Sequence, residues 1–305
     1  MANEQTYTGM GGNLRAAEIF NRLIHEDLTD RTDLRSTSVL LGDLGGSGSD
    51  TLVTPRVAFD DAMAAANVDE VTEADNTALG TGAISLSIAQ QIIAREVSDK
   101  LAITGAPGNL DLQILAADIV RAYVLRFTDL VCATFTTFTA IVSSTGVNMD
   151  MDDFYASMDT LEQAVVPGPW SMVLFTVQWT DLRTALRGEG LNPYLPAGSE
   201  HALGMHDPGY KGLINGVQVF ASDSVGSDGP DSNGAMYGPG GLVHAIASPN
   251  QAMAGSISAP VPAGSPLYAE FVRDGDPGLS QVVGHAFLAV GIGENARGVE
   301  IKTDR

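Results

Sequence analysis

Hydrophobic and polar residues alternate strictly over residues 83–89, where Ile84, Leu86 and Ile88 are separated by serine or alanine. This period of two predicts a β-strand with one apolar and one polar face. The stretch that begins at Thr51, TLVTPRVAFDDAMAAA, predicts the outgoing limb of the same hairpin. An isolated two-stranded ribbon is marginally stable in water. Residues 51–99 therefore predict an extended hairpin that needs cover from outside, most simply from a second copy of the chain.

A helical period of 3.6 marks residues 13–28, where Phe20, Leu23 and Ile24 fall on one face. The pattern predicts either a short helix or an element that binds a partner. A Gly/Ser-rich stretch follows at residues 42–49, which is typical of a flexible connection. We therefore interpret residues 1–50 as an N-terminal arm.

The strongest helical pattern covers residues 109–131, with a core stripe that includes Leu112, Leu115 and Ile119. Asn109 is a suitable N-cap residue, and some twenty residues give a rod of roughly 30 Å. Shorter helices are expected at residues 150–166 and 178–188. The long rod is expected to form the backbone of the fold.

Apolar runs predict strands at residues 170–177, 216–225 and 242–248, and further strands after residue 265. Residues 226–241 are rich in glycine, proline and aspartate and are interpreted as a loop. An arm, a hairpin, a long helix and then mixed elements indicate an α+β protein.

The charge balance adds a constraint on partners. Sixteen basic residues stand against 37 acidic ones, giving a formal net charge of -21. Phosphate contacts need clustered lysine and arginine, so direct nucleic-acid binding is disfavoured. The acidity has two interpretations, a saline habitat or ordinary solubility. The acidic residues at the hairpin tip are expected to be a solvated face or to meet a basic strip on a neighbour (Asp69, Glu70, Glu73, Asp75).

Motifs for catalysis do not stand out. His201, His206 and Asp207 are close in sequence, but a solvated loop explains them better than a metal site. His244 and His285 fall inside apolar strands and are expected to be structural. The glycine-rich segment at residues 45–48 lacks the lysine of a phosphate loop. We therefore expect no catalytic, cofactor-binding or metal-binding residues.

The order of these elements resembles that of the major capsid proteins of tailed bacteriophages, the Hong Kong 97 fold. DNTALGTGAISLSIAQQIIAREVSDKLAIT resembles the return limb of that family's extended loop. The helix that follows takes the place of the spine helix. Later segments resemble the axial domain and the closing strands: WSMVLFTVQWTDLRTALRG, GYKGLINGVQVFASDSV, GAMYGPGGLVHAIAS and QVVGHAFLAVGIGENARGVEIKTD.

The resemblance implies a Hong Kong 97-like division of the chain. Its expected parts are an N-terminal arm (1–50), an extended hairpin loop (51–99), a peripheral domain with the spine helix (100–166), an axial domain (167–257) and closing peripheral strands (258–305). Some relatives form lysine–asparagine crosslinks. The chain has only three lysines, and no crosslinking residue is assigned.

The implied function is that of a coat protein whose copies form pentamers and hexamers of an icosahedral shell around double-stranded DNA. The implied partners are further copies, separate scaffolding and portal proteins, decoration proteins and packaged DNA without sequence-specific contact. The expected location is the virion, after assembly in the host cytoplasm, with no membrane and no cofactor. Two alternatives stay open: an encapsulin-like protein compartment, and an enzyme whose site forms only in three dimensions.

Overall fold

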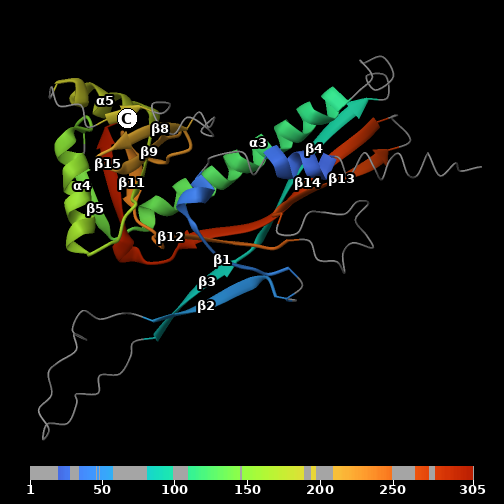
Figure 1. The fold of residues 1–305 in the computed structure, drawn as a ribbon, viewed down its shortest axis with the longest axis horizontal. Coiled ribbons are helices and arrows are strands. Elements are labelled where there is room, and N and C mark those ends of the chain that lie inside the picture. Colours follow the sequence, from blue (N-terminus) through green and yellow to red (C-terminus); the bar gives the residue numbers. More distant parts are fainter. Residues whose placement is uncertain are drawn as a thin grey trace, which may run out of the picture.

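The computed structural model describes residues 20–27, 34–45, 47, 49–57, 81–98, 109–144, 146–188, 194–196, 209–248, 265–274 and 279–304. They form an elongated molecule in which a long helix runs beside one sheet and leads to a second sheet with two helices, while a thin ribbon projects from the middle (Figure 1). The predicted α+β class is confirmed. No described helix has the length and apolarity required to cross a membrane.

A five-stranded sheet forms the elongated half of the molecule. Its strands are β1 (Val39–Asp43), β4 (Ala89–Ser98), β12 (Leu242–Ile246), β13 (Leu267–Asp274) and β14 (Leu279–Ile292). The long β14 is the centre: β4 pairs with one edge, and β13 and β12 pair in turn with the other. β1 extends the sheet by pairing in parallel with β12.

The predicted spine helix is α3 (Asn109–Thr134), whose 26 residues span about 39 Å. Its buried face packs on β14 in the largest core cluster of the described residues. Gly284 of β14 permits this close approach, because a Cβ there would lie 2.8 Å from Cγ2 of Ile119. Ile119 is fully buried and Leu115 partly buried, as the sequence pattern predicts. The side chain of Leu112 lies outside the described residues.

An eight-stranded sheet forms the compact half. Its strands are β5 (Ala140–Ser144), β6 (Ser171–Leu174), β7 (Tyr194–Pro196), β8 (Tyr210–Ile214), β9 (Val217–Ala221), β10 (Ser227–Asp228), β11 (Asp231–Tyr237) and β15 (Gly298–Asp304). The helices α4 (Met151–Gln163) and α5 (Thr176–Gly188) contribute to its core. A capping box starts α4: the Asp150 carboxylate accepts from Asp153 N at 3.0 Å, and Asp150 N donates to Asp153 Oδ2 at 3.3 Å.

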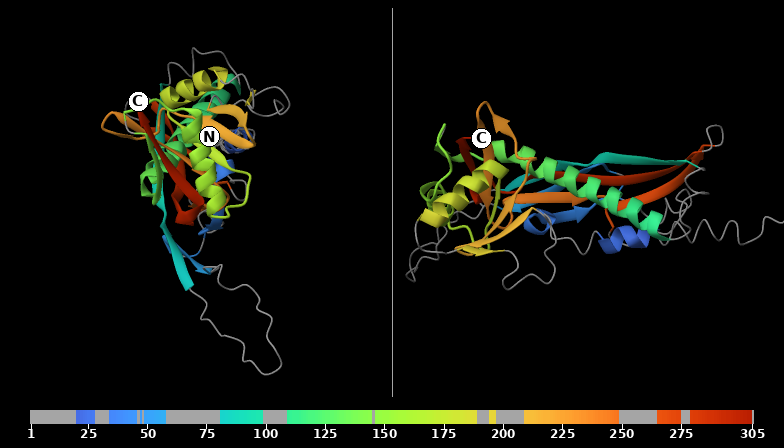
Figure 2. Two further views of the ribbon diagram at one scale, coloured as in Figure 1. Left: turned by 90° about the vertical axis from the view of Figure 1, so that its left-hand side faces the viewer. Right: turned by 90° about the horizontal axis from the view of Figure 1, so that it is seen from above.

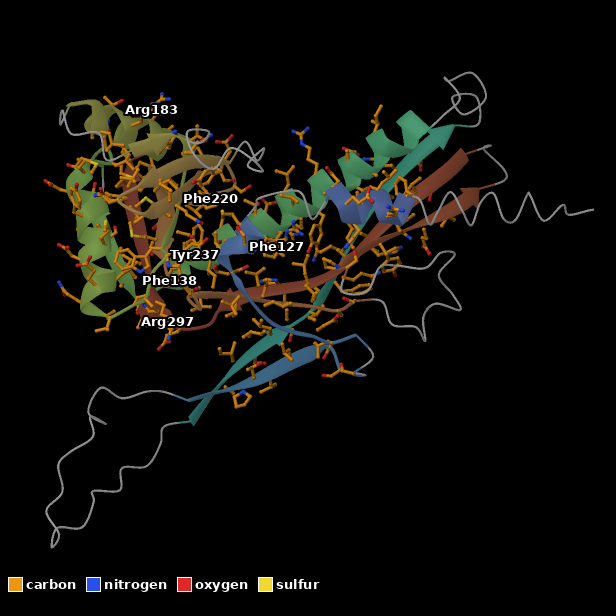
Figure 3. All side chains as sticks on the ribbon, in the orientation of Figure 1. Phe127, Phe138, Arg183, Phe220, Tyr237 and Arg297 are labelled. Atoms are coloured by element: carbon orange, nitrogen blue, oxygen red, sulfur yellow. The ribbon has the colours of Figure 1, made fainter. Side chains whose placement is uncertain are left out.

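Two connections that cross between the sheets lie side by side, one from β11 to β12 and one from β14 to β15. Gly238 N donates to the carbonyl oxygen of Arg297 at 2.9 Å, and Gly293 N donates to that of Gly241 at 3.0 Å. The Arg297 guanidinium also donates to the Pro239 carbonyl at 2.9 Å. Arg297, Phe138 and Tyr237 mark this junction in Figure 3. The short helices are η1 (Leu34–Thr37), η3 (Phe135–Thr137) and η4 (Asn295–Arg297).

Two expectations need correction. The loop expected at residues 226–241 contains β11, a buried strand in the interior of the eight-stranded sheet. The return limb of the hairpin changes partner, because β4 pairs with β14 over ten residues. The physical reason in each case is pairing between distant segments, which local sequence does not specify.

Candidate assembly surface

The projecting ribbon consists of β2 (Thr51–Val57) and β3 (Thr81–Ser87), paired antiparallel from Thr51 with Ser87 to Val57 with Thr81. The left view in Figure 2 shows the ribbon projecting from the body. The alternation seen in the sequence divides its side chains between two faces. One face turns toward the body of the molecule and the other is exposed.

The inner face attaches the ribbon to the chain's own sheet. Leu86 is only 6% exposed and packs in a cluster with Val243, Ala245 and Ala289. Gly291 of β14 makes room for it, since a Cβ there would lie 2.6 Å from Cδ2 of Leu86. The expectation that a second copy must cover this face is thus wrong for Leu86, because β12 and β14 of the same chain supply the cover.

The other two alternating residues, Ile84 and Ile88, are partly buried against the same cluster. Leu52 of β2, directly opposite Leu86, joins them. These contacts attach the base of the ribbon through four apolar side chains. The described ribbon is therefore attached at its base, and most of its remaining surface is exposed to solvent.

The outer face of the ribbon is small and uncharged. Val53 is 60% exposed, and Pro55, Ala83 and Ser85 are also exposed. Val53 pairs with Ser85 and Pro55 with Ala83, so the four residues are adjacent. A second molecule could pack on this face without burying a charge, which would be costly.

A cleft of about 460 Å³ opens between the ribbon and the body. It is lined by residues 82–87 of β3 and residues 289–293 at the end of β14. None of these eleven lining residues is charged, in a chain with a net charge of -21. The cleft lining and the four exposed residues of the outer face therefore carry no charge, on an acidic protein.

The acidic residues assigned to the hairpin tip, Asp69, Glu70, Glu73 and Asp75, lie outside the described residues. Their predicted contact with a neighbour therefore stays a prediction.

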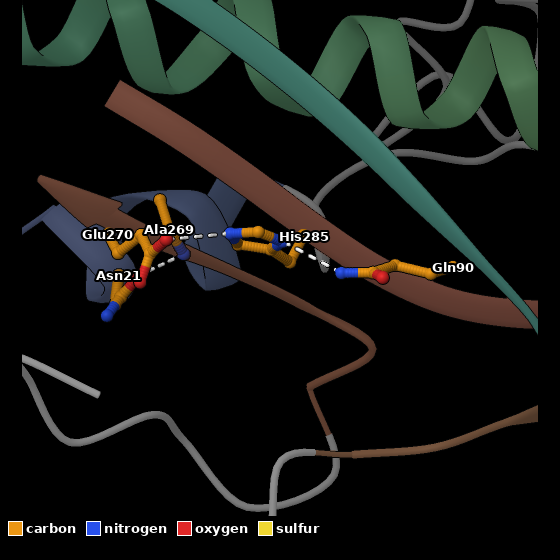
Figure 4. Close-up of polar contacts among 5 residues, drawn as sticks. All are labelled: Asn21, Gln90, Ala269, Glu270 and His285. Atoms are coloured by element: carbon orange, nitrogen blue, oxygen red, sulfur yellow. Dashed lines mark hydrogen bonds and ion pairs between the residues drawn. The ribbon is translucent and has the colours of Figure 1, made fainter. Parts of the chain in front are cut away.

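The arm residues Phe20, Leu23 and Ile24 pack into the core of their own chain and are not exposed for binding a partner. Residues 20–27 are helical, Phe20 and Ile24 are fully buried in the main core cluster, and Leu23 packs against it. Asn21 Oδ1 accepts from Ala269 N at 3.0 Å and fixes this helix to β13 (Figure 4). These apolar residues therefore stabilise the subunit itself.

Polar side chains also cross the five-stranded sheet beside this helix. His285 Nε2 lies 3.1 Å from Glu270 Oε1, and His285 Nδ1 lies 3.2 Å from Gln90 Nε2 (Figure 4). The Tyr268 ring stacks on the imidazole at a centroid distance of 5.1 Å. The contacts connect β13, β14 and β4, consistent with the structural role expected of His285.

His244 is held in a largely buried position on β12. Ser38 Oγ lies 2.9 Å from His244 Nδ1, and the Phe127 ring approaches the imidazole edge-on. Burial, aided by the positive charge of Arg35, lowers the pKa of His244 to about 4. A neutral imidazole at neutral pH suits a structural role.

The candidate metal ligands of the sequence, His201, His206 and Asp207, lie outside the described residues. Among the residues that the structure describes, no group of three or more His, Cys, Asp or Glu side chains is placed to hold a metal ion.

Sequence reasoning missed the importance of Gln178 on α5. This fully buried amide accepts from Phe175 N at 2.9 Å and donates to the Ser232 carbonyl at 2.9 Å and to Thr303 Oγ1 at 2.8 Å. It connects α5 to β11 and β15. A single glutamine in an apolar helix face was the only local signal for it.

The chain matches no protein-family model and no curated protein sequence. Solved structures, in contrast, match nearly the whole chain. The capsid of a native GTA particle has a TM-score of 0.59 at 12% identity, with 90% of both chains covered. The capsid of Ralstonia phage GP4 has a TM-score of 0.57 at 13% identity, covering 90% of this chain and 86% of that one.

The holo-SrpI encapsulin complex from Synechococcus elongatus is similar to the same degree, with a TM-score of 0.58 at 9% identity and 90% of both chains covered. At these identities the likeness concerns the fold. In each of these three comparisons about nine tenths of this chain is covered.

Proposed function

Because the chain has the Hong Kong 97-like fold shared by phage capsids and an encapsulin, we propose that it is the major capsid protein of a tailed bacteriophage. Its copies form pentamers and hexamers of an icosahedral shell that encloses double-stranded DNA. The observation that carries the proposal is the similarity across about 90% of the chain to phage and GTA capsids. The role is structural, and the protein is not an enzyme.

The projecting ribbon gives the proposal a physical basis. A ribbon held only at its base has little stability of its own, and its outer face is uncharged and exposed. Packing of this face on an adjacent copy buries apolar surface without bringing like charges together. Repeated in every subunit, such contacts close a shell under symmetry.

The acidity supports the second part of the proposal. A net charge of -21 per subunit repels DNA phosphates and so favours cargo that is enclosed without being bound. Separate scaffolding, portal and decoration proteins complete the particle, which assembles in the host cytoplasm and becomes part of the virion.

Electron microscopy of the purified protein, alone and with a phage lysate as a source of scaffold, tests the shell. We expect closed particles of uniform diameter, and monomers under all conditions would refute the proposal. The outer face is tested by Val53→Asp, which adds a charge to the exposed ribbon, with Asp152→Asn on the exposed start of α4 as the control. We expect only the ribbon variant to lose particles while both subunits stay folded.

A protein compartment of the encapsulin type is the second candidate, favoured by the similarity to the SrpI encapsulin. The contents of particles purified from the producing cell distinguish the two. An absorbance ratio at 260 and 280 nm typical of packed DNA supports the capsid, and a protein cargo without DNA supports the compartment.

A further inference from the structure

The two connections that cross between the sheets interlock at one point. The first is a turn over residues 238–241, closed by a hydrogen bond from Gly241 N to the Gly238 carbonyl at 3.0 Å. Pro239 takes its second position and Gly240 its third, where a φ of 81° suits glycine. The Pro239 carbonyl takes no part in closing this turn, so it can accept a hydrogen bond from outside.

The second connection, residues 293–297, lies against the backbone of that turn. Gly293 N donates to the Gly241 carbonyl at 3.0 Å, and Glu294 N donates to the Gly240 carbonyl at 3.1 Å. A Cβ on Gly241 would lie 2.7 Å from the Arg297 carbonyl oxygen, closer than a side chain allows. The two connections are therefore joined backbone to backbone.

Arg297 bonds both connections at once. Its Nε donates to Glu294 Oε2 at 2.6 Å within its own connection, and its Nη1 donates to the Pro239 carbonyl at 2.9 Å on the other. Its own carbonyl accepts from Gly238 N at 2.9 Å. The guanidinium is planar and its donors have fixed directions, so the Glu294 carboxylate orients the group that reaches Pro239.

The rest of the junction between the elongated half and the compact half is apolar. Phe127 and Phe135, near the end of α3, belong to the same core cluster as Phe220 and Tyr237 of the eight-stranded sheet. Figure 3 shows Phe127, Phe220 and Tyr237 above Arg297. Apolar burial has no preferred direction, whereas hydrogen bonds depend on their angles. The apolar side keeps the halves in contact, and the hydrogen-bonded crossing restricts the angle between them.

We propose that Arg297 is a positioning residue for assembly, because by bonding both connections it fixes the angle between the elongated half and the compact half. The ribbon projects from one half, and α4 and α5 belong to the other. Contacts repeated under symmetry close into one shell only when every subunit presents its surfaces at the same angle. The inference rests on the proposed shell function and names a residue that sets the geometry of the subunit.

Spin labels on the free, full-length subunit test the angle directly. We would attach them at the exposed positions of Ala94 on β4 and Thr184 on α5, as cysteine variants, while the buried Cys132 stays unlabelled. Pulsed electron paramagnetic resonance then measures the distribution of distances between the halves. We expect Arg297→Ala to broaden this distribution. Arg126→Ala, which loses only a bond within the elongated half, is the matched control and should leave it unchanged. An unchanged distribution in Arg297→Ala would overturn the proposal.

A lysine variant separates geometry from charge. Arg297→Lys keeps a positive charge beside Glu294 but lacks the planar fork that reaches two acceptors at once. We therefore expect it to broaden the distribution as Arg297→Ala does. Amide exchange at Gly238 and Gly293 should be about tenfold faster in both variants, as for the loss of one net hydrogen bond. Wild-type behaviour of Arg297→Lys would overturn the positioning role, and this variant decides the outcome if Arg297→Ala fails to fold.

The shape of assembled particles tests the link to assembly. We expect both Arg297 variants to give particles of mixed diameter or open sheets where the wild-type protein and Arg126→Ala give uniform particles. Uniform particles from subunits with a broadened angle would overturn the assembly role of Arg297. If the wild-type protein forms no particles, the shell function fails, while the spin-labelled subunit still decides whether Arg297 fixes the angle.

Discussion

Replacement of Gln178 by leucine should destabilise the subunit by about 1 to 5 kcal/mol. The substitution conserves volume, so its effect comes from the partners of the lost amide. Phe175 N–H and the Ser232 carbonyl, each at 2.9 Å, lose their bonds inside the core, whereas the Thr303 hydroxyl can rotate. Each buried group left unsatisfied costs about 1 to 3 kcal/mol, and the added apolar burial returns about 1 kcal/mol.

Urea unfolding followed by tryptophan fluorescence measures this difference. Both tryptophans of the chain, Trp170 and Trp179, belong to the core around α5 and report on it directly. Gln163→Leu, at the exposed end of α4, is the matched control and should change stability by less than about 0.5 kcal/mol. A loss below about 1 kcal/mol for Gln178→Leu would show that the amide does not hold α5 to β11 and β15 and would refute the reasoning.

Three further predictions concern the core. Ile119→Asp buries an unpaired charge on α3 and should leave the protein insoluble, whereas Ile114→Asp, at a position 61% exposed, should give normal soluble yield. The unfolded chain protonates His244 near pH 6.5 and the folded chain only near pH 4. The unfolding free energy should therefore fall as pH drops through this interval, and less so in His244→Gln. Burial raises the pKa of Cys132 to about 12, so iodoacetamide should label it at pH 8 in urea but not in the native protein.

Local signals in the sequence were sufficient to predict the helices α3 and α4. The apolar stripe of α3 and the acidic start of α4 follow from spacing and from the capping preference of Asp150, which the structure realises as a complete capping box. Alternation also identified β3, since Leu86 lies between two serines. These features depend on residues within one or two turns of each other, which explains why pattern reasoning found them.

β11 could not be predicted in the same way. Its first three residues are Asp231, Ser232 and Asn233, all buried, and hydrophobicity alone assigns such a stretch to a loop. Gly234 is required because a Cβ there would lie 2.9 Å from the Val173 carbonyl oxygen. Only the neighbouring strands β6 and β15 make this polar segment a strand in the sheet interior. The cleft escaped prediction for a related reason, since it depends on where two distant ladders separate.

The inward-facing residues of the alternating segment 81–89 stabilise the subunit itself, and the outward-facing residues are those proposed to contact another subunit. Leu86 faces inward and attaches the ribbon to its own sheet, while its neighbour Ser85 is exposed on the outer face. A charge of either sign at Leu86 would be buried and therefore costly, whereas at Ser85 a negative charge would add to the repulsion between acidic copies. The absence of charge across residues 81–89 is consistent with folding at the inner positions and with the proposed assembly contact at the outer ones. Variants at the inward-facing positions should therefore change the unfolding free energy of the subunit. Variants at the outward-facing positions should change the concentration at which particles form.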